Sequence, residues 1–298
     1  MKILLTGAAG QVGGALLQQF QDRANIVAPP REAFDLSQPA GLAEKLDAIA
    51  PDLIINPAAY TAVDRAEDER EMAFRVNAES PRAIAQWAAR RHIPLVHFST
   101  DYVFDGSGDR PWREDSTPRP LSVYGESKLA GDQAIAEAGG PHLIARTSWV
   151  YAASGANFLK TIVRLAGERE ELRIVADQIG SPTTAGAIAR AMVAMLQPAD
   201  GDVAAMFDRR GGPVNLVCAG ETSWHGFAVA IVSGLKSRGA KFAVKQILPI
   251  ASSEFPVKAK RPFNSRLDLT RLRERFDIAM PTWQQALDPE LDALNGTM

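Results

Sequence analysis

The sequence is poor in the residues that build disulfide scaffolds and metal centres. Its 298 residues include one cysteine, Cys218, and four histidines with no His-x-x-x-His spacing. A single thiol excludes an internal disulfide and a four-cysteine metal site. The scattered histidines argue against a helical zinc site, and we interpret His92 and His97 as structural residues that flank a strand. We therefore expect neither a four-cysteine metal site nor a histidine-based zinc site.

Long apolar runs and an excess of one charge are also missing. The formal net charge is -2, so the chain carries no electrostatic signature of nucleic-acid binding. The apolar run after Lys2 stops at Thr6, which is too short for a signal peptide. No run of 18 apolar residues is present to cross a membrane. We expect a cytoplasmic protein without a membrane or nucleic-acid partner.

The N-terminus carries the clearest signal of fold. A short apolar strand is predicted at 2–6, and helical spacing of apolar residues begins near Ala15. A Gly-x-x-Gly-x-x-Gly turn joins them, which is the setting of a dinucleotide-binding turn, although a plain glycine turn is the alternative. The free N–H groups of the helix would face a pyrophosphate. The predicted cofactor contacts are Gly7, Gly10, Gln11, Val12 and Gly13.

The next segments continue the alternation of strands and helices. Strands are predicted at 25–28, 52–56, 93–99 and 142–146, with helices at 39–49 and from Ser80 onward. This alternation predicts an α/β fold, a Rossmann-type doubly wound parallel sheet. We assign 1–150 to an NAD(P)-binding domain and 151–298 mainly to a smaller α/β substrate lobe, with parts of 173–217 returning to the first domain. Further helices are predicted at 157–167, 185–196, 223–235 and 282–294, and strands near 173–175, 214–217 and 242–248.

The end of the second predicted strand bears on cofactor choice. NAD-binding proteins place an acidic residue there for the ribose hydroxyls, but here the strand runs into Arg31. A guanidinium suits a 2′-phosphate, so we expect NADPH, with NADH as a possible substitute; a solvated loop arginine is the alternative. Asp35 and Leu36 follow and are expected to border the adenine.

A compact proton-transfer set is predicted between Ser99 and Lys128. Tyr124 and Lys128 are four residues apart, so their side chains share one face of the helix that Ser122 caps. A nearby ammonium lowers the pKa of a phenol, which then exchanges a proton with an alkoxide. The Thr100 hydroxyl, at the end of the fourth predicted strand, offers a second hydrogen bond. Tyr-x-x-x-Lys also arises by chance, so its structural context decides.

Several motifs together resemble one family. The chain is similar to the extended short-chain dehydrogenase/reductases and, among them, to the reductases that form dTDP-L-rhamnose. The resemblance extends over nearly the whole chain. The matching motifs are Gly7-x-x-Gly-Gln-Val-Gly13, Ala58-Ala59-Tyr60-Thr61-Ala62-Val63-Asp64, Ser99-Thr100-Asp101-Tyr102-Val103-Phe104-Asp105-Gly106, Val123-Tyr124-Gly125, Arg146-Thr147-Ser148-Trp149-Val150-Tyr151 and Arg261-Pro262-x-Asn264-Ser265.

The resemblance implies an activity and a set of residue roles. The reaction is reduction of the C4 ketone of dTDP-6-deoxy-L-lyxo-4-hexulose by NADPH or NADH, and the resemblance implies that no catalytic metal is needed. Tyr124 would supply the proton, Lys128 would lower its pKa and hold the nicotinamide ribose, and Thr100 would orient the ketone. The resemblance also implies cofactor contacts at Ala58, Ala59, Tyr60 and Ser99, and substrate contacts at Thr61, Val63, Tyr102, Phe104, Trp149 and Arg261. For Arg261 a structural salt bridge is the alternative, and for Trp149 it is core packing.

Other functions stay open at this point. A reductase or epimerase of another nucleotide-deoxysugar fits the same motifs, as does a non-catalytic NADP-binding regulatory subunit. Some similar proteins are metal-bridged dimers that use acidic residues, but the matching positions here are Ala15 and Gly186. We therefore expect a monomer or a weak homodimer.

Overall fold

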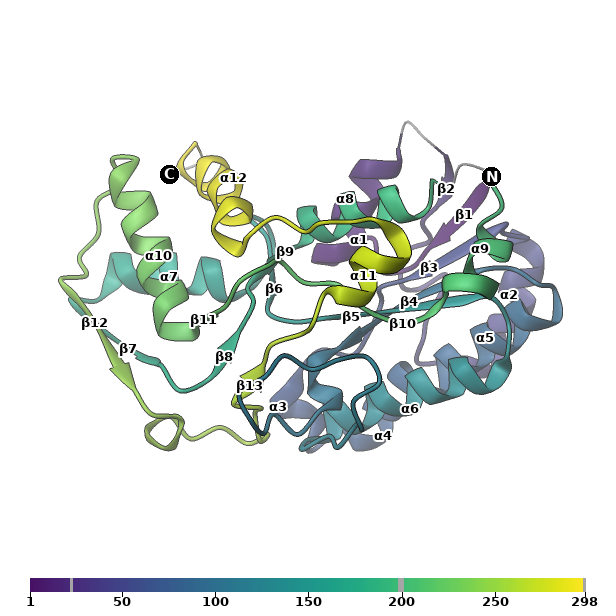
Figure 1. Cartoon of the computed structure of the whole chain (residues 1–298), viewed down its shortest axis with the longest axis horizontal. Coiled ribbons are helices and arrows are strands. Elements are labelled where there is room, and N and C mark those ends of the chain that lie inside the picture. Colours follow the sequence, from purple (N-terminus) through teal and green to yellow (C-terminus); the bar gives the residue numbers. More distant parts are fainter. Residues whose placement is uncertain (22–23, 198–200, 297–298) are drawn as a thin grey trace.

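A six-stranded parallel sheet forms the centre of the computed structural model, which describes residues 1–21, 24–197 and 201–296. The strand order is β10-β5-β4-β3-β1-β2 (Figure 1). This topology confirms the predicted Rossmann-type α/β fold. The strands are β1 (Lys2–Leu5), β2 (Asn25–Val27), β3 (Leu53–Asn56), β4 (Leu95–Thr100), β5 (His142–Thr147) and β10 (Gly212–Asn215).

Successive residues of each central strand enter two different cores. In β1, Ile3 and Leu5 pack with the helices of one face, whereas Leu4 packs with those of the other. Both faces of the sheet are therefore buried, which explains why its strands are continuously apolar. The first layer contains α1 (Gln11–Phe20) and α8 (Ala185–Met195). The second contains α2 (Leu42–Ile49), α5 (Ser80–Arg90) and α6 (Val123–Ala138).

Parallel pairing brings the carboxyl ends of the strands to one edge. Leu5 of β1 lies beside Ile55 of β3, and Thr100 of β4 lies beside Thr147 of β5. The loops that follow these strands therefore gather at the same edge, where open parallel sheets bind their ligands.

A second lobe packs beside the sheet and is seen on the left of Figure 1. Its helices are α7 (Phe158–Glu168), α10 (Trp224–Ser237) and α12 (Trp283–Asn295). Its strand pairs are β7 (Glu171–Val175) with β12 (Gln246–Ile250), and β6 (Val150–Tyr151) with β9 (Thr183–Thr184). A third group joins β11 (Thr222–Ser223), β8 (Ile179–Gly180) and β13 (Asn264–Ser265).

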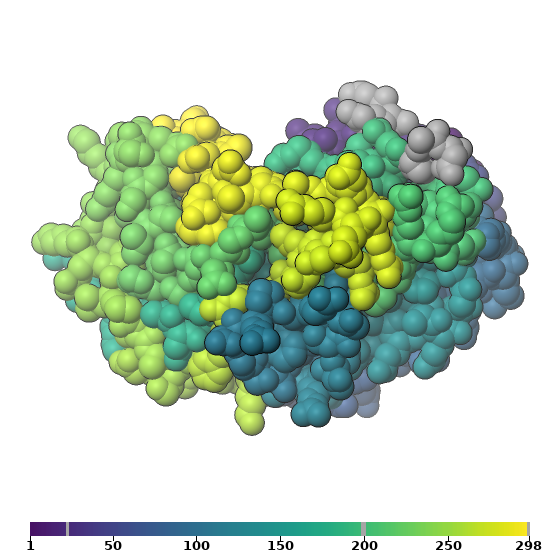
Figure 2. All heavy atoms as spheres, in the orientation of Figure 1, coloured from purple at the N-terminus to yellow at the C-terminus, as the bar shows by residue number. Residues whose placement is uncertain are grey.

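Segments far apart in the sequence connect the two lobes. The Trp112 N–H donates to the Arg266 carbonyl over 2.9 Å, and the Asp268 N–H donates to the Trp112 carbonyl over 2.9 Å. Figure 2 shows these two segments, blue and yellow, side by side on the front face. The edge strand β10 is followed in the chain by the second lobe and is flanked by α9 (Val203–Arg210) and α11 (Thr270–Phe276).

Several predicted boundaries were wrong. The strand expected at 242–248 is β12, which begins at Gln246 because pairing with β7 starts there. The strand expected at 214–217 is β10, whose pairing with β5 ends at Asn215. His97 lies inside β4 rather than beside it. The sequence also gave no indication of the helical run α3 (Val63–Ala66), α4 (Arg70–Phe74) and the π-helical η2 (Arg75–Glu79).

Candidate active site

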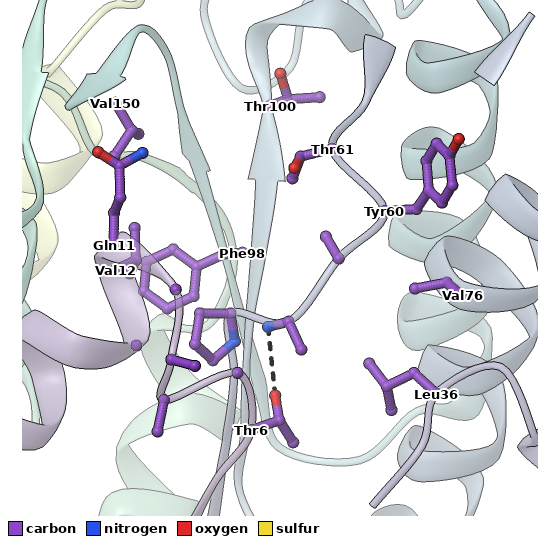
Figure 3. A pocket seen from close by; sticks show the side chains of 18 of the residues that line it. Thr6, Gln11, Val12, Leu36, Tyr60, Thr61, Val76, Phe98, Thr100 and Val150 are labelled. Atoms are coloured by element: carbon purple, nitrogen blue, oxygen red, sulfur yellow. Dashed lines mark hydrogen bonds between the residues drawn. The ribbon is translucent and has the colours of Figure 1, made fainter. Parts of the chain in front are cut away.

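A cavity of about 950 Å³ lies over the carboxyl ends of the sheet strands. Figure 3 shows Gln11 and Val12 on one wall, Leu36 and Val76 on the opposite wall, and Thr100 at the far end. The loops after β1, β2, β3, β4 and β5 all contribute to its lining. The predicted site residues that line it are Gly7, Gly10, Gln11, Val12, Gly13, Arg31, Asp35, Leu36, Ala58, Ala59, Tyr60, Thr61, Val63, Ser99, Thr100, Tyr102, Tyr124, Lys128 and Trp149.

The glycine turn fits a dinucleotide pyrophosphate. Gly7 has φ of +59°, a conformation that side chains rarely adopt. A methyl group at Gly13 would lie 2.1 Å from the Gly7 carbonyl oxygen, so only glycine lets α1 begin so close to the strand end. Gly10 caps α1 without a side-chain hydrogen bond, which leaves the first N–H groups available to an anion.

The loop after β2 presents one cation and one locally engaged carboxylate. The Ser37 N–H and hydroxyl each donate to Asp35 over 2.8 Å, and these bonds lower the pKa of Asp35. The Asp35 oxygens are therefore already used within the loop. Arg31 is exposed at the cavity lining and suits an additional phosphate.

Asn77 fixes the loop after β3, a role that the sequence did not reveal. Its amide accepts from the Tyr60 N–H over 2.8 Å and donates to the Tyr60 carbonyl over 3.0 Å. The same amide donates to the Ser127 hydroxyl on α6 over 3.0 Å. The sequence offers only a weak signal for this contact, which is an asparagine between two apolar residues. The loop that carries Ala58 and Tyr60 is thus held by its backbone.

Thr100 and Tyr124 meet at the end of the cavity. Ser122 caps α6 by accepting from the Gly125 N–H over 3.2 Å, which places Tyr124 in the first turn. A methyl group at Gly125 would lie 2.3 Å from the Tyr102 carbonyl oxygen, so glycine permits this approach. Burial raises the pKa of Tyr124, and a hydrogen bond with Thr100 opposes that rise. The phenol is consequently held protonated beside a second hydroxyl.

The position of Lys128 differs from the expectation. Its amine donates to the Phe98 carbonyl over 2.6 Å and lies 3.0 Å from Nε2 of His97. Burial lowers the pKa of Lys128 to about 8. Burial is the largest influence on the Tyr124 pKa and raises it, so the lowering of that pKa by Lys128 stays a prediction. The four-residue spacing aligns the two residues, but the long side chain ends on β4.

Asp101 is a buried acid of the site that sequence reasoning missed. It lines the cavity, and its Oδ1 accepts from the Thr100 hydroxyl over 3.1 Å. Its Oδ2 has no hydrogen-bond partner among the described residues. Burial raises the pKa of Asp101 to about 6. A titratable group thus lies directly beside the predicted catalytic hydroxyl.

Two predicted substrate contacts lie outside the cavity lining. Phe104 is fully buried and stacks on Trp112, with ring centroids 4.8 Å apart, so its side chain supports the site from the core. The structure therefore corrects the expected contact of Phe104 with substrate. Arg261 forms an ion pair with Asp64 at 2.7 Å, the salt-bridge alternative, and lies 3.4 Å from the Tyr102 hydroxyl.

Trp149 lies in the lining and is held from behind. Its backbone has a positive φ of 49°, and its ring stacks on Trp224 with centroids 3.5 Å apart. The Trp224 indole donates to Gln178 over 3.2 Å. The strained backbone and the stack together fix this aromatic wall.

The structure describes residues 1–21, 24–197 and 201–296. They contain no group of three or more His, Cys, Asp or Glu side chains placed to hold a metal ion. No helix in this part of the chain is long and apolar enough to cross a membrane.

The parallel sheet, glycine turn and hydroxyl-lined cavity define a Rossmann-type dinucleotide-binding protein of the oxidoreductase class. The sequence matches the RmlD substrate binding domain family over residues 1–295. The chain belongs to this family, which confirms the resemblance stated from the motifs.

Named relatives agree with that assignment. The dTDP-4-dehydrorhamnose reductase of Burkholderia thailandensis is 45% identical over 289 residues, which cover 96% of this chain and 97% of the relative. That of Escherichia coli is 41% identical over 303 residues, which cover 99% and 98%. A crystal structure of the Bacillus anthracis dTDP-4-dehydrorhamnose reductase in complex with NADP has a TM-score of 0.87 and 33% identity, covering 98% and 99% of the two chains.

Proposed function

We propose that this protein reduces the C4 ketone of dTDP-6-deoxy-L-lyxo-4-hexulose to give dTDP-L-rhamnose. The observation that carries the proposal is the meeting of Thr100 and Tyr124 at the end of a cavity that begins at the glycine turn. The family supports the substrate class, since relatives of this chain are dTDP-4-dehydrorhamnose reductases.

The same residues suggest how the cofactor is held. The α1 N-terminus would bind the pyrophosphate, Arg31 the 2′-phosphate of NADPH, and the loop of Ala58, Ala59 and Tyr60 the flat face of the dinucleotide. Asp35 and Leu36 would border the adenine, and Ser99 and Lys128 the nicotinamide end. NADPH, when bound, supplies the hydride, and NADH is the weaker substitute.

Tyr124 supplies the proton in this proposal. Its raised pKa keeps the phenol protonated at neutral pH, so the proton is present when the carbonyl oxygen becomes an alkoxide. Thr100 donates a second hydrogen bond to that oxygen and orients the ketone. Lys128 contributes a hydrogen-bond donor whose charge is adjustable near neutral pH, because its pKa is about 8.

The remaining lining holds the sugar and excludes water. Thr61, Val63, Tyr102 and Trp149 all line the cavity and would contact the sugar. Arg261, which forms an ion pair with Asp64, would attract the diphosphate of the substrate. Phe104 has only a supporting role.

One assay tests the reaction. Purified protein should oxidise NADPH in the presence of the enzymatically prepared 4-keto precursor, and NMR should identify the product as dTDP-L-rhamnose. A different deoxysugar product, or exchange of stereochemistry without NADPH consumption, would show another reductase or an epimerase. NADP binding without turnover of the precursor would instead show a regulatory subunit.

We also propose that the protein works in the cytoplasm as a monomer or weak homodimer. Ala15 and Gly186 offer no carboxylate to a bridging metal ion. Light scattering should give the same mass with magnesium and with a chelator. A mass that halves on chelation would contradict this.

A further inference from the structure

A buried chain of hydrogen bonds leads from the cofactor loop to Lys128. The Ala58 N–H donates to the Thr6 hydroxyl over 3.3 Å (Figure 3), and that hydroxyl donates to Oδ1 of Asn56 over 2.6 Å. Nδ2 of Asn56 lies 3.1 Å from Nδ1 of His97, and Nε2 of His97 lies 3.0 Å from the Lys128 amine. Thr6, Asn56, His97 and Lys128 are each at most 3% exposed.

The direction of these bonds determines which hydrogen His97 carries. Thr6 already accepts from Ala58, so its own proton goes to Oδ1 of Asn56. The Asn56 amide nitrogen then donates to Nδ1 of His97, so this ring nitrogen accepts and carries no hydrogen. Burial lowers the pKa of His97 well below its usual range, so the ring is neutral and its single hydrogen lies on Nε2. That hydrogen points at Lys128.

An ammonium has no lone pair to accept this hydrogen, but a neutral amine does. The neutral Lys128 amine can accept from His97 while it donates to the Phe98 carbonyl. Within the described residues, no carboxylate forms an ion pair with Lys128. The charge of Asp132 on α6 favours the charged amine and so opposes the lowering of the Lys128 pKa, but its carboxylate pairs with Arg146 of β5 at 3.3 Å and accepts from Ser99 over 2.9 Å. Tyr124 of α6 and Asp101 of η3 (Asp101–Val103) line the same cavity as Lys128.

We propose that His97 is a positioning residue that donates a hydrogen bond to the neutral amine of Lys128 and thereby sets the pH at which Lys128 becomes charged. This inference rests on the proposed role of Lys128 and extends it to a residue outside the cavity lining. The hydrogen bonds of Thr6 and Asn56 determine which ring nitrogen of His97 carries the hydrogen that faces Lys128. The pH at which Lys128 becomes charged therefore depends on the arrangement of Thr6 and Asn56.

Titration of Lys128 in the ligand-free protein tests this directly. NMR of the ε-methylene group in protein with isotope-labelled lysine follows the charge of the amine, and the spectrum of Lys128→Met assigns the signal. The wild-type midpoint should lie near pH 8, in agreement with the lowered pKa of Lys128. Tyr124 and Asp101 remain unchanged in every variant below.

Two substitutions at His97 separate its two contacts. His97→Asn keeps a polar atom for Asn56 but is too short to reach Lys128, so the neutral amine loses its donor. The midpoint should rise by about half a pH unit to one pH unit, the size expected for one hydrogen bond. His97→Gln places its terminal amide near the Nε2 position, so its midpoint should stay with that of the wild type.

The outcomes are distinct. A rise in His97→Asn that is absent from His97→Gln supports the proposal. Equal midpoints in both variants and the wild type, or a fall in His97→Asn, would overturn it, since the fall means that His97 accepts from the ammonium. NADPH turnover by Lys128→Met, measured alongside, tests the proposed role of Lys128 separately, because the titration requires neither cofactor nor substrate.

Discussion

The rings of Tyr102 and Tyr124 meet edge to face, with centroids 5.5 Å apart and planes inclined at 77°. Both phenols are buried, and burial raises the pKa of Tyr102 to about 12 and that of Tyr124 as well. Their hydroxyl groups have different partners, however. The Tyr102 hydroxyl lies 3.4 Å from an Arg261 nitrogen, whereas Thr100 counteracts the rise in the pKa of the Tyr124 hydroxyl. We therefore expect these two neighbouring tyrosines of one cavity to have separate tasks.

Removing the Tyr124 hydroxyl should abolish most turnover. We expect Tyr124→Phe to fold, to bind NADPH, and to lose about 100-fold or more in kcat, because the alkoxide loses its proton donor. Tyr102→Phe is the matched control: it deletes the neighbouring hydroxyl and should change KM for the sugar more than kcat. Steady-state NADPH oxidation measures both, and a kcat of Tyr124→Phe close to wild type would exclude Tyr124 as the acid.

Asp101 should make the protein less stable as pH rises. Its pKa of about 6 in the folded chain exceeds the ordinary 3.8, so the folded state binds the extra proton. This contribution to stability is complete below the ordinary pKa and is lost as pH rises through about 6. The loss amounts to about 3 kcal/mol in the free energy of unfolding.

Asp101→Asn cannot titrate and serves as the reference. Urea unfolding of both proteins across this pH range should show the wild type losing stability relative to the variant. Parallel curves for the two proteins would contradict a raised pKa.

Arg31 should set the preference for NADPH. We expect Arg31→Ala to weaken NADPH binding about tenfold, the size of one charge-assisted hydrogen bond, because the 2′-phosphate loses its guanidinium. NADH lacks that phosphate, so its affinity in the same variant is the internal control. Cofactor fluorescence measures both affinities. An equal loss for the two cofactors would indicate a general effect on the loop.

Gly131 should tolerate no side chain. A methyl group there would lie 2.1 Å from the Asn77 carbonyl oxygen, a backbone atom of η2 that cannot move freely. We expect Gly131→Ala to lower the free energy of unfolding by about 2 kcal/mol or more. It should also weaken cofactor binding, because Asn77 holds Tyr60.

A second helical glycine provides the comparison for that substitution. Gly167 in α7 has open space where a methyl group would be added. Gly167→Ala should therefore raise stability by about 0.5 to 1 kcal/mol through helix propensity alone. Chemical unfolding distinguishes the two, and similar stabilities would show that α6 and η2 can move apart.

Periodic patterns allowed much of the fold to be predicted. Apolar runs of four to six residues between helical segments indicated the central strands, and Ser122 indicated where α6 begins. Local spacing was less reliable in the second lobe, where β6, β8, β9, β11 and β13 have only two residues each. Such short strands exist because a distant partner pairs with them, and no local pattern marks them.

The sequence by itself determined the strand–glycine–helix start, the parallel α/β sheet, and the residues available for the site, because hydrophobic period and backbone freedom are local properties. Only the tertiary structure decided where the long or buried side chains end. It directed the Lys128 amine to His97 and the Phe98 carbonyl, buried Phe104 against Trp112, and left one Asp101 oxygen without a hydrogen-bond partner among the described residues. These outcomes depend on burial and on partners from distant segments, and spacing along the chain specifies neither.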